Sequence, residues 1–516
     1  MLRRGINMAN IIGIDLGTTF SAVARLDENG KPAIVANDEG GNITPSVVEF
    51  TSKDSYQVGK EAKKMLGVSK NIVPGGPNDE AKRHMGDSEK VYEIFGEKHT
   101  PVTISALILK KLKEDVEAVH GPIDSAIVTV PANFANEARE GTKEAAQLAG
   151  LNVELIINEP TAAALAYSFL SSDELNGTFV IYDLGGGTFD CSIARVRNQD
   201  IEILTSEGVR VLGGKDFDNA LLEIVKEKFH NETGNDLNLR SFNINKAEEV
   251  KITLSKREKT MISITSAEGV ADIEVTREEF EEAISTLVAQ AEAAVEAALS
   301  RLKLKPNQIT DVILVGGSTR IPCIQKSVSK IFGKDPKLYG NPDEMVALGA
   351  AIYSAYKSEP SQLSVLQRKA ISNISLQEVT NHCFGIVAEV EKASGEKGPE
   401  NTIVIPRDEK IPCSVTASYF TAVDDQTDVR LQVTQSATEE RDVNFVRVIW
   451  DGNLKLPTGH PAGQEIKVTY SFKEGNFMKA AFVLSHDRRH RKEVDLDIDR
   501  KTSDKSTTDV SKFKVE

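Results

Sequence analysis

The sequence predicts an α/β module followed by an all-β module, and three observations support this fold class. Strand-like and helix-like segments alternate from residue 10 to about residue 357, a strand ending in Asp-Leu-Gly occurs twice, and short alternating runs rich in Val, Thr, Ile and Phe fill the last part of the chain. Strands that feed helices are typical of α/β folds with parallel or mixed sheets. At 516 residues the chain is too long for one hydrophobic core, so we expect two to four folding units.

The first part should contain regular strands and helices in alternation. The expected strands include Ile11–Asp15, Ala126–Val130, Phe179–Asp183 and Asp311–Val315. The expected helices include Thr103–His120, Asn136–Ala149, Ala220–His230 and Thr276–Leu302. Helical periodicity ends near Lys369, which marks the change to the second part.

The second part shows the period-two pattern of a half-buried strand. Val429–Val433 and Ile466–Phe472 alternate apolar and polar residues, and the turn signals Asp451-Gly452 and Glu474–Asn476 separate such runs. We therefore predict a β-sandwich over residues 379–500. The polar residues 501–516 are predicted to be a disordered tail.

Composition excludes some classes of partner and site. The formal charge of −15 disfavours nonspecific binding to nucleic acid or to anionic lipid, because both need a basic surface. The four cysteines have no metal-binding or redox spacing and indicate small buried hydrophobes in a reducing compartment; they are Cys191, Cys323, Cys383 and Cys413.

The expected location is the cytoplasm. No apolar run reaches the roughly 18 residues of a membrane helix. The segment Met1–Asn10 lacks the apolar centre of a secretory signal. Met8 is an alternative start, with residues 1–7 as an upstream extension.

A weak internal repeat predicts two related lobes. Ile11–Phe20 returns as Phe179–Phe189, each an apolar strand followed by Asp-Leu-Gly and then a Thr-Phe step. We expect one lobe over about 10–177 and the other over about 178–357. A ligand bound between them would be held by both turns.

The chemistry of these turns indicates a nucleotide bound with magnesium. Glycine lets the backbone turn its N–H groups toward a phosphate, and the threonine hydroxyls donate further hydrogen bonds. The aspartates would repel a polyphosphate by about 3 kcal/mol per close pair, taking about 6 Å and an effective dielectric near 20. A divalent ion reverses the sign of this interaction, and Mg²⁺ is the usual bridge between carboxylates and phosphates.

The motifs resemble those of the DnaK-type 70-kDa heat-shock chaperones. The matching segments occur in the family's order across about two-thirds of the chain; they are Asp15–Phe20, Val130–Phe134, Ile157–Tyr167, Asp183–Asp190, Leu212–Asp218, Val315–Pro322 and Asn341–Ala347. The resemblance implies an actin-like ATPase module of two duplicated, ribonuclease-H-like lobes with a nucleotide cleft between them. It also implies ATP or ADP with Mg²⁺ as ligands, and K⁺ as a further candidate ion.

The resemblance assigns roles to residues of this sequence. It implies catalytic roles for Lys82, Glu159, Asp183 and Thr188, and a metal site of Asp15, Asp183 and Asp190 that acts mostly through water. The alternative for Lys82 is an ordinary surface lysine. The implied ATP-binding residues are Gly17, Thr18, Thr19, Phe20, Gly185, Gly186, Gly187, Thr188, Gly213, Gly214, Glu248, Lys251, Ser255, Gly316, Gly317, Ser318, Arg320 and Asp343.

A signalling path to the second module is also implied. Pro131 and Arg139 match the family's proline switch and arginine relay, although a proline after a strand is usually only a terminator. The nucleotide-binding module is expected over 1–373 and the linker over 374–378. Ile374 and Leu376 keep one apolar face of that linker, while its other face is polar. It should therefore dock weakly, or act as a flexible tether.

The sandwich resembles the family's peptide-binding module less closely. The implied groove residues are Ile386, Phe420, Ala422, Val429 and Leu431, which are almost equally well explained as core residues of a plain sandwich. Glu389 falls near an apolar groove position of relatives and puts the outer wall of the pocket in doubt. The helical lid of the family is expected to be absent.

The resulting hypothesis is an ATP-dependent chaperone that binds extended apolar peptides of unfolded proteins. It implies a J-domain co-chaperone and a nucleotide-exchange factor as partners, no nucleic acid, no membrane, and a monomer. The alternative is a non-cycling, nucleotide-bound scaffold or co-chaperone. Actin-like filament formation is disfavoured by the appended sandwich, and a sugar kinase by the lack of a sugar-site motif.

Overall fold

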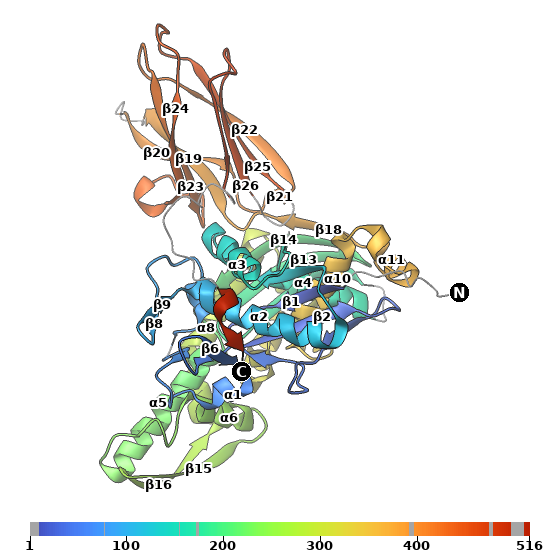
Figure 1. Ribbon diagram of the computed structural model, residues 1–516, viewed down its shortest axis with the longest axis vertical. Coiled ribbons are helices and arrows are strands. Elements are labelled where there is room, and N and C mark those ends of the chain that lie inside the picture. Colours follow the sequence, from blue (N-terminus) through green and yellow to red (C-terminus); the bar gives the residue numbers. More distant parts are fainter. Residues whose placement is uncertain are drawn as a thin grey trace. The chain divides into compact units, whose positions relative to one another are not determined.

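The computed structural model of the chain forms two compact units (Figure 1). It describes residues 10–76, 78–153, 155–171, 175–391, 397–473, 478–496 and 510–515. The first unit contains Met1–Leu376 together with Thr507–Glu516, and the second contains Gln377–Ser506. The boundary between Leu376 and Gln377 lies inside the segment expected to be the linker.

The first unit begins with a mixed sheet in the order β11-β10-β1-β2-β3. Its strands are β1 (Ile11–Asp15), β2 (Phe20–Leu26), β3 (Pro32–Val35), β10 (Ser125–Val130) and β11 (Ile156–Asn158). β1 runs parallel to β10 and antiparallel to β2. The chain reverses between β1 and β2 just after Asp15, so this carboxylate stands at the end of a central strand.

A second sheet repeats this arrangement. Its order includes β17-β12-β13-β14, formed by β12 (Asn176–Leu184), β13 (Phe189–Arg197), β14 (Asp200–Val209) and β17 (Asp311–Val315). β12 runs parallel to β17 and antiparallel to β13. Asp183 therefore stands near the end of β12 as Asp15 stands at the end of β1.

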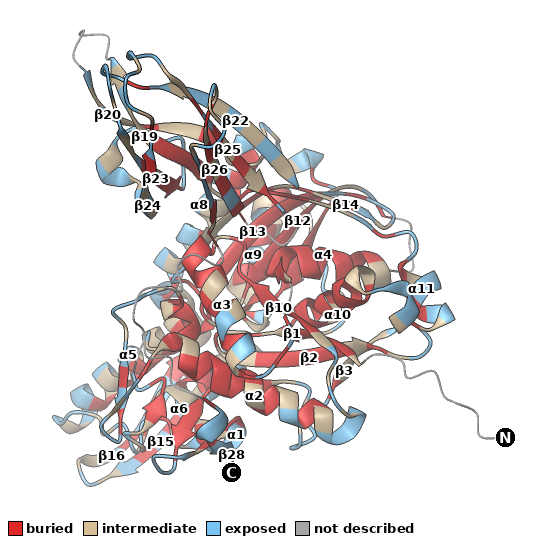
Figure 2. Cartoon of the chain, turned by 45° about the horizontal axis from the view of Figure 1, so that its top comes forward, coloured by how far each residue is buried: buried red, intermediate tan, exposed pale blue. Residues whose placement is uncertain are grey.

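Two buried helices lie at the centre of this unit. α4 (Glu159–Leu170) and α10 (Met345–Lys357) are built largely from small apolar residues and are buried over most of their length (Figure 2). A Cβ added to Gly349 would lie 1.7 Å from the carbonyl oxygen of Ala162, so the two helices pack with their backbones in close approach. A helix that is apolar on all sides is expected in such a position.

The remaining helices cover the sheets or extend from them. They are α1 (Lys60–Lys64), α2 (Pro101–His120), α3 (Asn136–Leu148), α5 (Gly214–Thr233), α6 (Ile244–Leu254), α7 (Arg277–Ala283), α8 (Ser285–Arg301), α9 (Pro322–Phe332) and α11 (Val365–Ile371), with 3-10 turns η1 (Ala81–His84), η2 (Pro306–Gln308), η3 (Gly317–Arg320) and η4 (Pro360–Gln362). The predicted helix Thr276–Leu302 is wrong in its continuity, because it is divided at Ile284. That residue is fully buried, and its φ of −96° and ψ of 2° lie outside the helical range, so the helix is interrupted there.

Short strands complete the first unit. They are β4 (Thr44–Pro45), β5 (Val48–Phe50), β6 (Ser55–Val58), β7 (Ile72–Val73), β8 (Tyr92–Ile94), β9 (Glu97–His99), β15 (Lys259–Ser266) and β16 (Gly269–Thr276). At the end of this unit, β18 (Ser375–Val379) begins with the N–H of Ser375 donating to the carbonyl of Gln199.

The second unit is a β-sandwich of two four-stranded sheets, with orders β20-β19-β23-β24 and β22-β25-β26-β27. Its strands are β19 (Cys383–Glu391), β20 (Lys397–Ile405), β21 (Lys410–Ile411), β22 (Cys413–Phe420), β23 (Asp428–Ser436), β24 (Arg447–Lys455), β25 (Glu465–Phe472), β26 (Met478–Leu484) and β27 (Arg491–Asp495), with the 3-10 turn η5 (Val443–Phe445). Ile466–Phe472 shows the alternation that its sequence predicts, with every apolar residue buried.

The turn predicted at Asp451-Gly452 is wrong. Both residues lie within β24, where Asp451 is opposite Gln432 and Gly452 is opposite Leu431. Asp451 accepts hydrogen bonds from Arg430 and Gln432 on the neighbouring strand. Gly452 lies beneath the Trp450 ring, which a Cβ would approach to 2.4 Å. Asp and Gly favour turns by residue type, but here contacts with the neighbouring strand and with Trp450 hold both residues in β24. Residues 474–476 lie outside the described residues.

The prediction of a disordered tail is wrong for residues 510–515. They form η7 (Val510–Lys512) and β28 (Lys514–Val515), and they belong to the first unit. Val510 and Phe513 are each 1% exposed, so two apolar side chains anchor an otherwise polar segment. Residues 497–509 lie outside the described part of the chain.

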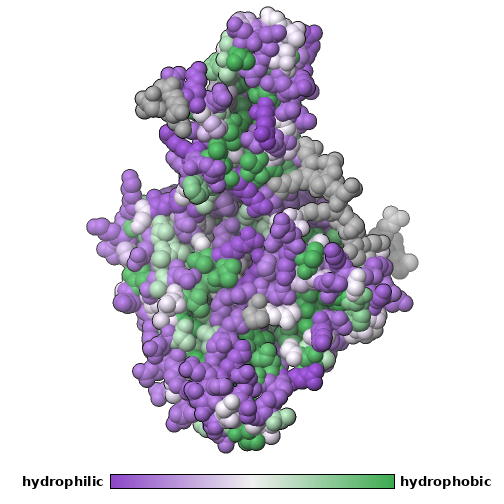
Figure 3. All heavy atoms as spheres, turned by 90° about the vertical axis from the view of Figure 1, so that its left-hand side faces the viewer, coloured by the Kyte–Doolittle hydropathy of each residue, from purple (hydrophilic) through white to green (hydrophobic). Residues whose placement is uncertain are grey.

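The face of the molecule drawn in Figure 3 is mainly hydrophilic. On the face drawn in Figure 3, apolar side chains gather only in small patches among polar ones, as the formal charge of −15 favours. Within the described ranges, no helix combines the length and apolarity that crossing a membrane requires.

Candidate functional site: a nucleotide cleft

The first unit contains a cleft of about 690 Å³ that both Asp-Gly turns line. Most sequence-predicted residues meet here; those in the lining are Asp15, Gly17, Thr18, Thr19, Phe20, Lys82, Glu159, Asp183, Gly185, Gly186, Thr188, Gly214, Glu248, Lys251, Ser255, Gly316, Gly317, Ser318, Arg320 and Asp343. Gly187, Gly213 and Asp190 lie behind this lining. The volume is within the range of small-molecule sites.

The two turns face each other in close contact. A Cβ on Gly186 would lie 1.8 Å from Oγ1 of Thr19, and a Cβ on Gly187 would lie 2.4 Å from Cγ2 of Thr18. No side chain larger than hydrogen fits at either glycine without moving the opposite turn. Thr19 Oγ1 is buried and has no hydrogen-bond partner, so it can donate to a ligand in the cleft.

The second turn is supported by the N-terminus of α5. The N–H groups of Gly214 and Lys215 donate to the carbonyls of Gly185 and Gly186, and Ser318 Oγ donates to the carbonyl of Gly185. A Cβ on Gly213 would lie 2.4 Å from the Gly187 nitrogen. Gly213 is therefore behind the turn and holds its shape.

The predicted catalytic residues converge on one buried ion pair. Glu159 is the first residue of α4, and its carboxylate accepts a short hydrogen bond from Lys82 Nζ on η1. Burial by itself would lower the pKa of Lys82, but the carboxylates of Glu159 and Asp15 outweigh it and raise the pKa. Lys82 is 7% exposed, which excludes the alternative of an ordinary surface lysine.

Three further carboxylates surround this pair. Burial, followed by the charge of Glu159, raises the pKa of Asp15 to about 7 and that of Asp190 to about 8. The same two causes raise the pKa of Asp183 well above its usual value. Burying several carboxylates side by side is unfavourable unless a cation accompanies them. The cluster therefore marks a site for positive charge.

The geometry suits a cation held through water. Thr129 Oγ1 donates to Asp15, whereas Asp190 Oδ1 is buried without a partner. No group of three or more His, Cys, Asp or Glu side chains in the described ranges is placed to ligate a metal directly. These residues fit an Mg²⁺ ion that keeps its waters and bridges to phosphate, as Mg²⁺ commonly does.

The opposite side of the cleft is formed by α6. Lys251 Nζ lies 2.7 Å from Asp218 and donates to the Gly214 carbonyl, and Ser255 Oγ donates to the Lys251 carbonyl. Ile252 is 48% exposed and lines the cleft together with Leu338. An apolar residue at this position offers a surface on which an aromatic base can stack.

Glu248 takes part in a contact that the sequence analysis missed. Its carboxylate lies 2.5 Å from Lys63 Nζ on α1. Burial opposes ionisation of Glu248, but Lys215, Lys63 and Lys251 outweigh it and lower the pKa of this carboxyl. Lys63 also lies over the Phe20 ring. The pair joins residues 185 positions apart, and no local motif around Lys63 signals it.

The loop after β17 closes this side. Gly316 has φ +81°, and a Cβ there would lie 2.4 Å from the Leu184 carbonyl oxygen, so the position requires glycine. Arg320 is paired with Asp343 at 2.5 Å and donates to Asn341. A Cβ on Gly317 would contact the same Asp343 carboxylate.

The predicted relay residues lie directly behind the Lys82–Glu159 pair. Arg139 is buried and donates to the carbonyls of Ala132 and Phe134 and to Asn158 Oδ1. Pro131 accepts from the Phe134 N–H in the same turn. Because Asn158 immediately precedes Glu159, Arg139 connects the Pro131 turn to the residue that holds Lys82.

The linker and groove residues have mixed environments. Ile374 is 7% exposed, and Leu376 is half-buried. In the sandwich, Ile386 and Leu431 are buried in the core, whereas Phe420 and Ala422 are exposed and Val429 is half-buried. Glu389 is exposed. Two of the five groove candidates are thus core residues and two are exposed, so the groove stays a prediction.

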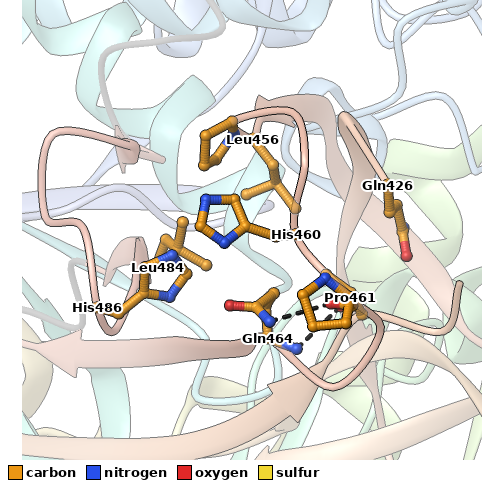
Figure 4. A pocket seen from close by; sticks show the side chains of 9 residues that line it. Gln426, Leu456, His460, Pro461, Gln464, Leu484 and His486 are labelled. Carbon is orange, nitrogen blue, oxygen red and sulfur yellow. Dashed lines mark hydrogen bonds between the residues drawn. The ribbon is translucent and has the colours of Figure 1, made fainter. Parts of the chain in front are cut away.

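One small hollow lies among the sandwich loops (Figure 4). It measures about 10 Å³. The rings of His460 and His486 line it with centroids 5.0 Å apart, and Gln464 closes one side by donating to the Pro461 carbonyl. Such a volume holds about one water molecule. The hollow is too small for a peptide side chain.

Comparison with protein families agrees with this geometry. A family model described as Hsp70 protein matches residues 11–93 and 77–516 of the chain. The match extends over nearly the whole sequence, including both units. Members of that family are ATPases and ATP-dependent chaperones that use a nucleotide with Mg²⁺.

Proposed function

The chain belongs to the Hsp70 protein family, and from that premise we propose that it binds and hydrolyses Mg-ATP in the cleft of its first unit. The observation that carries the proposal is the cluster of two opposed Asp-Gly turns around the buried Lys82–Glu159 pair. Both glycine turns line the cleft in which the phosphates would bind, and the surrounding carboxylates favour a cation beside them.

Each group has a role in the proposed hydrolysis. A water attacks the γ-phosphorus, a new P–O bond forms, and the bond to the β–γ bridging oxygen breaks to release ADP. Lys82 offsets the charge on the γ-phosphate, while Glu159 fixes the direction of the Lys82 ammonium. Thr188 and Thr19 offer hydroxyls toward the phosphates. Most of the acceleration in phosphoryl transfer comes from such positioning and electrostatics.

Asp15, Asp183 and Asp190 would hold the magnesium ion, mainly through its waters. When bound, the ion supplies positive charge that neutralises the phosphates. Without it, burial and then the charge of Glu159 raise the pKa of all three carboxyls. The hydrogen bond from Thr129 Oγ1 orients the carboxylate of Asp15.

Single-turnover hydrolysis tests this function. We expect Lys82→Ala to lower the hydrolysis rate constant about 10²-fold or more, with ATP affinity nearly intact, because one charged contact to the reacting group is lost. Lys111→Ala is a matched control, since Lys111 is also buried and paired, but with Asp115 on α2. Equal rates for Lys82→Ala and wild type would exclude Lys82 from the mechanism, and no Mg²⁺-dependent turnover in wild type would contradict the proposal.

We further propose that the sandwich binds extended apolar peptides and that ATP controls their release. The support is the family, whose members generally bind unfolded peptides, J-domain co-chaperones and exchange factors. The exposed Phe420 and the half-buried Val429 are the candidate contacts. Arg139, between the Pro131 turn and Asn158, is the candidate relay from the nucleotide.

One observation favours the alternative of a non-cycling scaffold. The side-chain amide of Gln377 donates to the carbonyl of Ile411, and Glu378 is opposite Ile411 in the ladder between β18 and β21. The polar half of the predicted linker is thus engaged within the sandwich unit. Peptide release measured with ATP and with ADP separates the two functions: equal release rates would support the scaffold.

A further inference from the structure

We propose that residues 510–515 form a strap that docks reversibly on the first unit and gives the sandwich a second attachment to it. The strap follows the sandwich in sequence, yet its contacts are with the first unit. In Figure 1 it is the red segment at the C label, beside α2 and β6. In the sequence, the sandwich therefore lies between two segments that belong to the first unit: the chain up to Leu376 and the strap.

The anchor of the strap is Phe513. Its ring is 1% exposed and lies 5.8 Å from the Phe50 ring, 6.3 Å from the Tyr56 ring and 5.8 Å from the His99 ring, measured between centroids. Two of these contacts are edge-on, which is a favourable aromatic geometry. Val510, three residues earlier, is also 1% exposed. The first unit thus provides a socket for one aromatic and one aliphatic side chain.

Backbone pairing sets the direction and register of the strap. β28 runs parallel to β6, with Lys514 opposite Ser55 and Val515 opposite Tyr56. The Lys514 N–H donates to the Asp54 carbonyl at 2.9 Å. The strap adds an edge strand to the sheet that contains β5, β6 and β7. This is the geometry by which extended peptides are recognised at sheet edges.

Two lysines complete the site. Lys110 on α2 donates to the carbonyls of Val510 and Phe513, at 3.4 Å and 2.7 Å. Lys512 of the strap lies 3.5 Å from Glu97. The hydrogen bonds from Lys110 reach only backbone carbonyls and do not depend on the side chains of the strap. Any sequence preference of the site must therefore come from the two buried apolar side chains, Val510 and Phe513.

The small size of the contact makes docking reversible without unfolding the unit. The ladder has two residues and the docked segment has two buried side chains. Short peripheral elements of this kind open with free energies well below that of global unfolding. Leu496 and Val510 are 510 − 496 = 14 positions apart, so a docked strap limits their separation to about 50 Å. An undocked strap removes that limit.

The first experiment compares hydrogen exchange in the full chain and in Phe513→Ala. We expect Phe513→Ala to abolish protection of residues 510–515 and to lower protection of Ser55–Val58 at least tenfold, with β1 unchanged. Phe445→Ala is the control, because Phe445 is a phenylalanine of the sandwich that is 76% exposed. Undiminished protection of 510–515 in Phe513→Ala would overturn the assignment of the anchor. Loss of protection in β1 as well would show a fixed part of the fold and overturn reversibility.

A second experiment measures whether the socket accepts a peptide. The probe is a fluorescein-labelled synthetic peptide with the sequence of residues 507–516. In wild type the attached strap competes at an effective concentration in the millimolar range. We therefore expect Phe513→Ala to bind the probe at least about tenfold more tightly than wild type does. A probe with alanine in place of Phe513 should bind neither protein. Equal affinities of the labelled probe for the two proteins would contradict a reversible strap.

A third experiment identifies the chain that supplies the strap. Ser55→Cys combined with Lys514→Cys places two cysteines at opposed positions of the ladder, within the separation that a disulfide spans. We expect oxidation to give a cross-linked monomer, and small-angle scattering of Phe513→Ala to show a larger maximum dimension than Phe445→Ala. A cross-linked dimer would mean that a second copy of the chain supplies the strap. An equal maximum dimension for Phe513→Ala and Phe445→Ala would mean that the strap does not restrain the sandwich. Either outcome overturns the proposal.

Discussion

The cleft of the first unit and the core of the sandwich use buried side chains in opposite ways. Around the cleft, Lys82, Glu159, Asp183 and Asp190 are all less than 10% exposed. The sandwich core is built from apolar side chains, and the buried hydroxyl of Tyr470 in it donates to the Gly385 carbonyl. Burying charge is unfavourable, whereas burying apolar surface drives folding. The cleft is therefore organised for chemistry at the expense of stability.

This difference separates two kinds of mutational effect. A substitution in the sandwich core should change the stability of that unit and leave nucleotide binding unchanged. A substitution in the cleft should change binding or hydrolysis and have little effect on the sandwich. The carboxyls of Asp15, Asp183 and Asp190, whose pKa is strongly raised, lie together around the cleft, as is typical of functional sites.

The largest expected effect is on the stability of the sandwich. Phe482 is fully buried and its ring is stacked on Trp450, with centroids 5.8 Å apart. Phe482→Ala should lower the free energy of unfolding of this unit by about 3–5 kcal/mol, with ATP affinity unchanged. Urea unfolding followed by fluorescence can measure this, because the single tryptophan of the chain reports on the sandwich alone. Loss of ATP binding in this variant would show that the two units are not independent.

The next effect is on nucleotide binding. Gly186→Ala would place a Cβ 1.8 Å from the Thr19 hydroxyl oxygen, forcing the two turns apart. We expect ATP affinity measured by calorimetry to fall about 100-fold, which corresponds to about 2.7 kcal/mol. Gly76→Ala is the matched control, since a Cβ there meets nothing within 4 Å. Wild-type affinity in Gly186→Ala would mean that the close approach of the two turns does not shape the phosphate site.

A smaller effect is expected at the predicted peptide groove. Phe420 is 63% exposed, so Phe420→Ala should not destabilise the sandwich. If a peptide covers this ring, its loss should speed peptide release about tenfold, since burying a phenylalanine contributes about 1.5–3 kcal/mol. Stopped-flow fluorescence with Phe445→Ala as the exposed control measures the release rate. Identical rates for the two variants would remove Phe420 from the groove.

A residue's position is predictable from the sequence when a local pattern determines it, and is not predictable when a contact with a residue far away in the chain determines it. The positions of Asp15 and Asp183 near the ends of matching strands were predictable, because an apolar strand followed by Asp-Leu-Gly is a local pattern. The pairing of Lys63 with Glu248 was not, because only the folded chain brings these residues together. Asp451-Gly452 was predicted as a turn because turn signals are local, whereas the partner Arg430 belongs to another strand.

The strap was missed for a related reason. Most of residues 501–516 are polar, and composition predicts disorder for such a stretch. Two side chains, Val510 and Phe513, provide the anchoring, and their socket is built from residues more than 400 positions earlier in the chain, including Phe50, Tyr56 and His99. No local pattern encodes a binding partner at that separation.

The smallest expected effect is a pH dependence that should be confined to the first unit. His99 is 2% exposed, lies between Phe50 and Phe513, and has a buried Nδ1 without a hydrogen-bond partner. Burial lowers the pKa of His99, Glu97 opposes this shift, and Lys512 adds to it. The docked strap therefore favours the neutral imidazole.

The sign of the effect follows from linkage. Well above pH 6.5, which is the ordinary pKa of histidine, the imidazole is neutral whether or not the strap covers it, so docking is at full strength. As the pH falls below 6.5, an uncovered His99 binds a proton that the covered one does not, and docking weakens by at most about tenfold per pH unit.

Hydrogen exchange of residues 510–515 at pH 7.0 and 5.5, corrected for intrinsic rates, should show a several-fold loss of protection. Strands β25 and β26 of the sandwich should show none. His99→Gln should remove the dependence while keeping the strap docked, because glutamine does not titrate. A pH dependence that persists in His99→Gln would assign the titration to another group, and an equal loss in β25 would contradict the contrast between the two units.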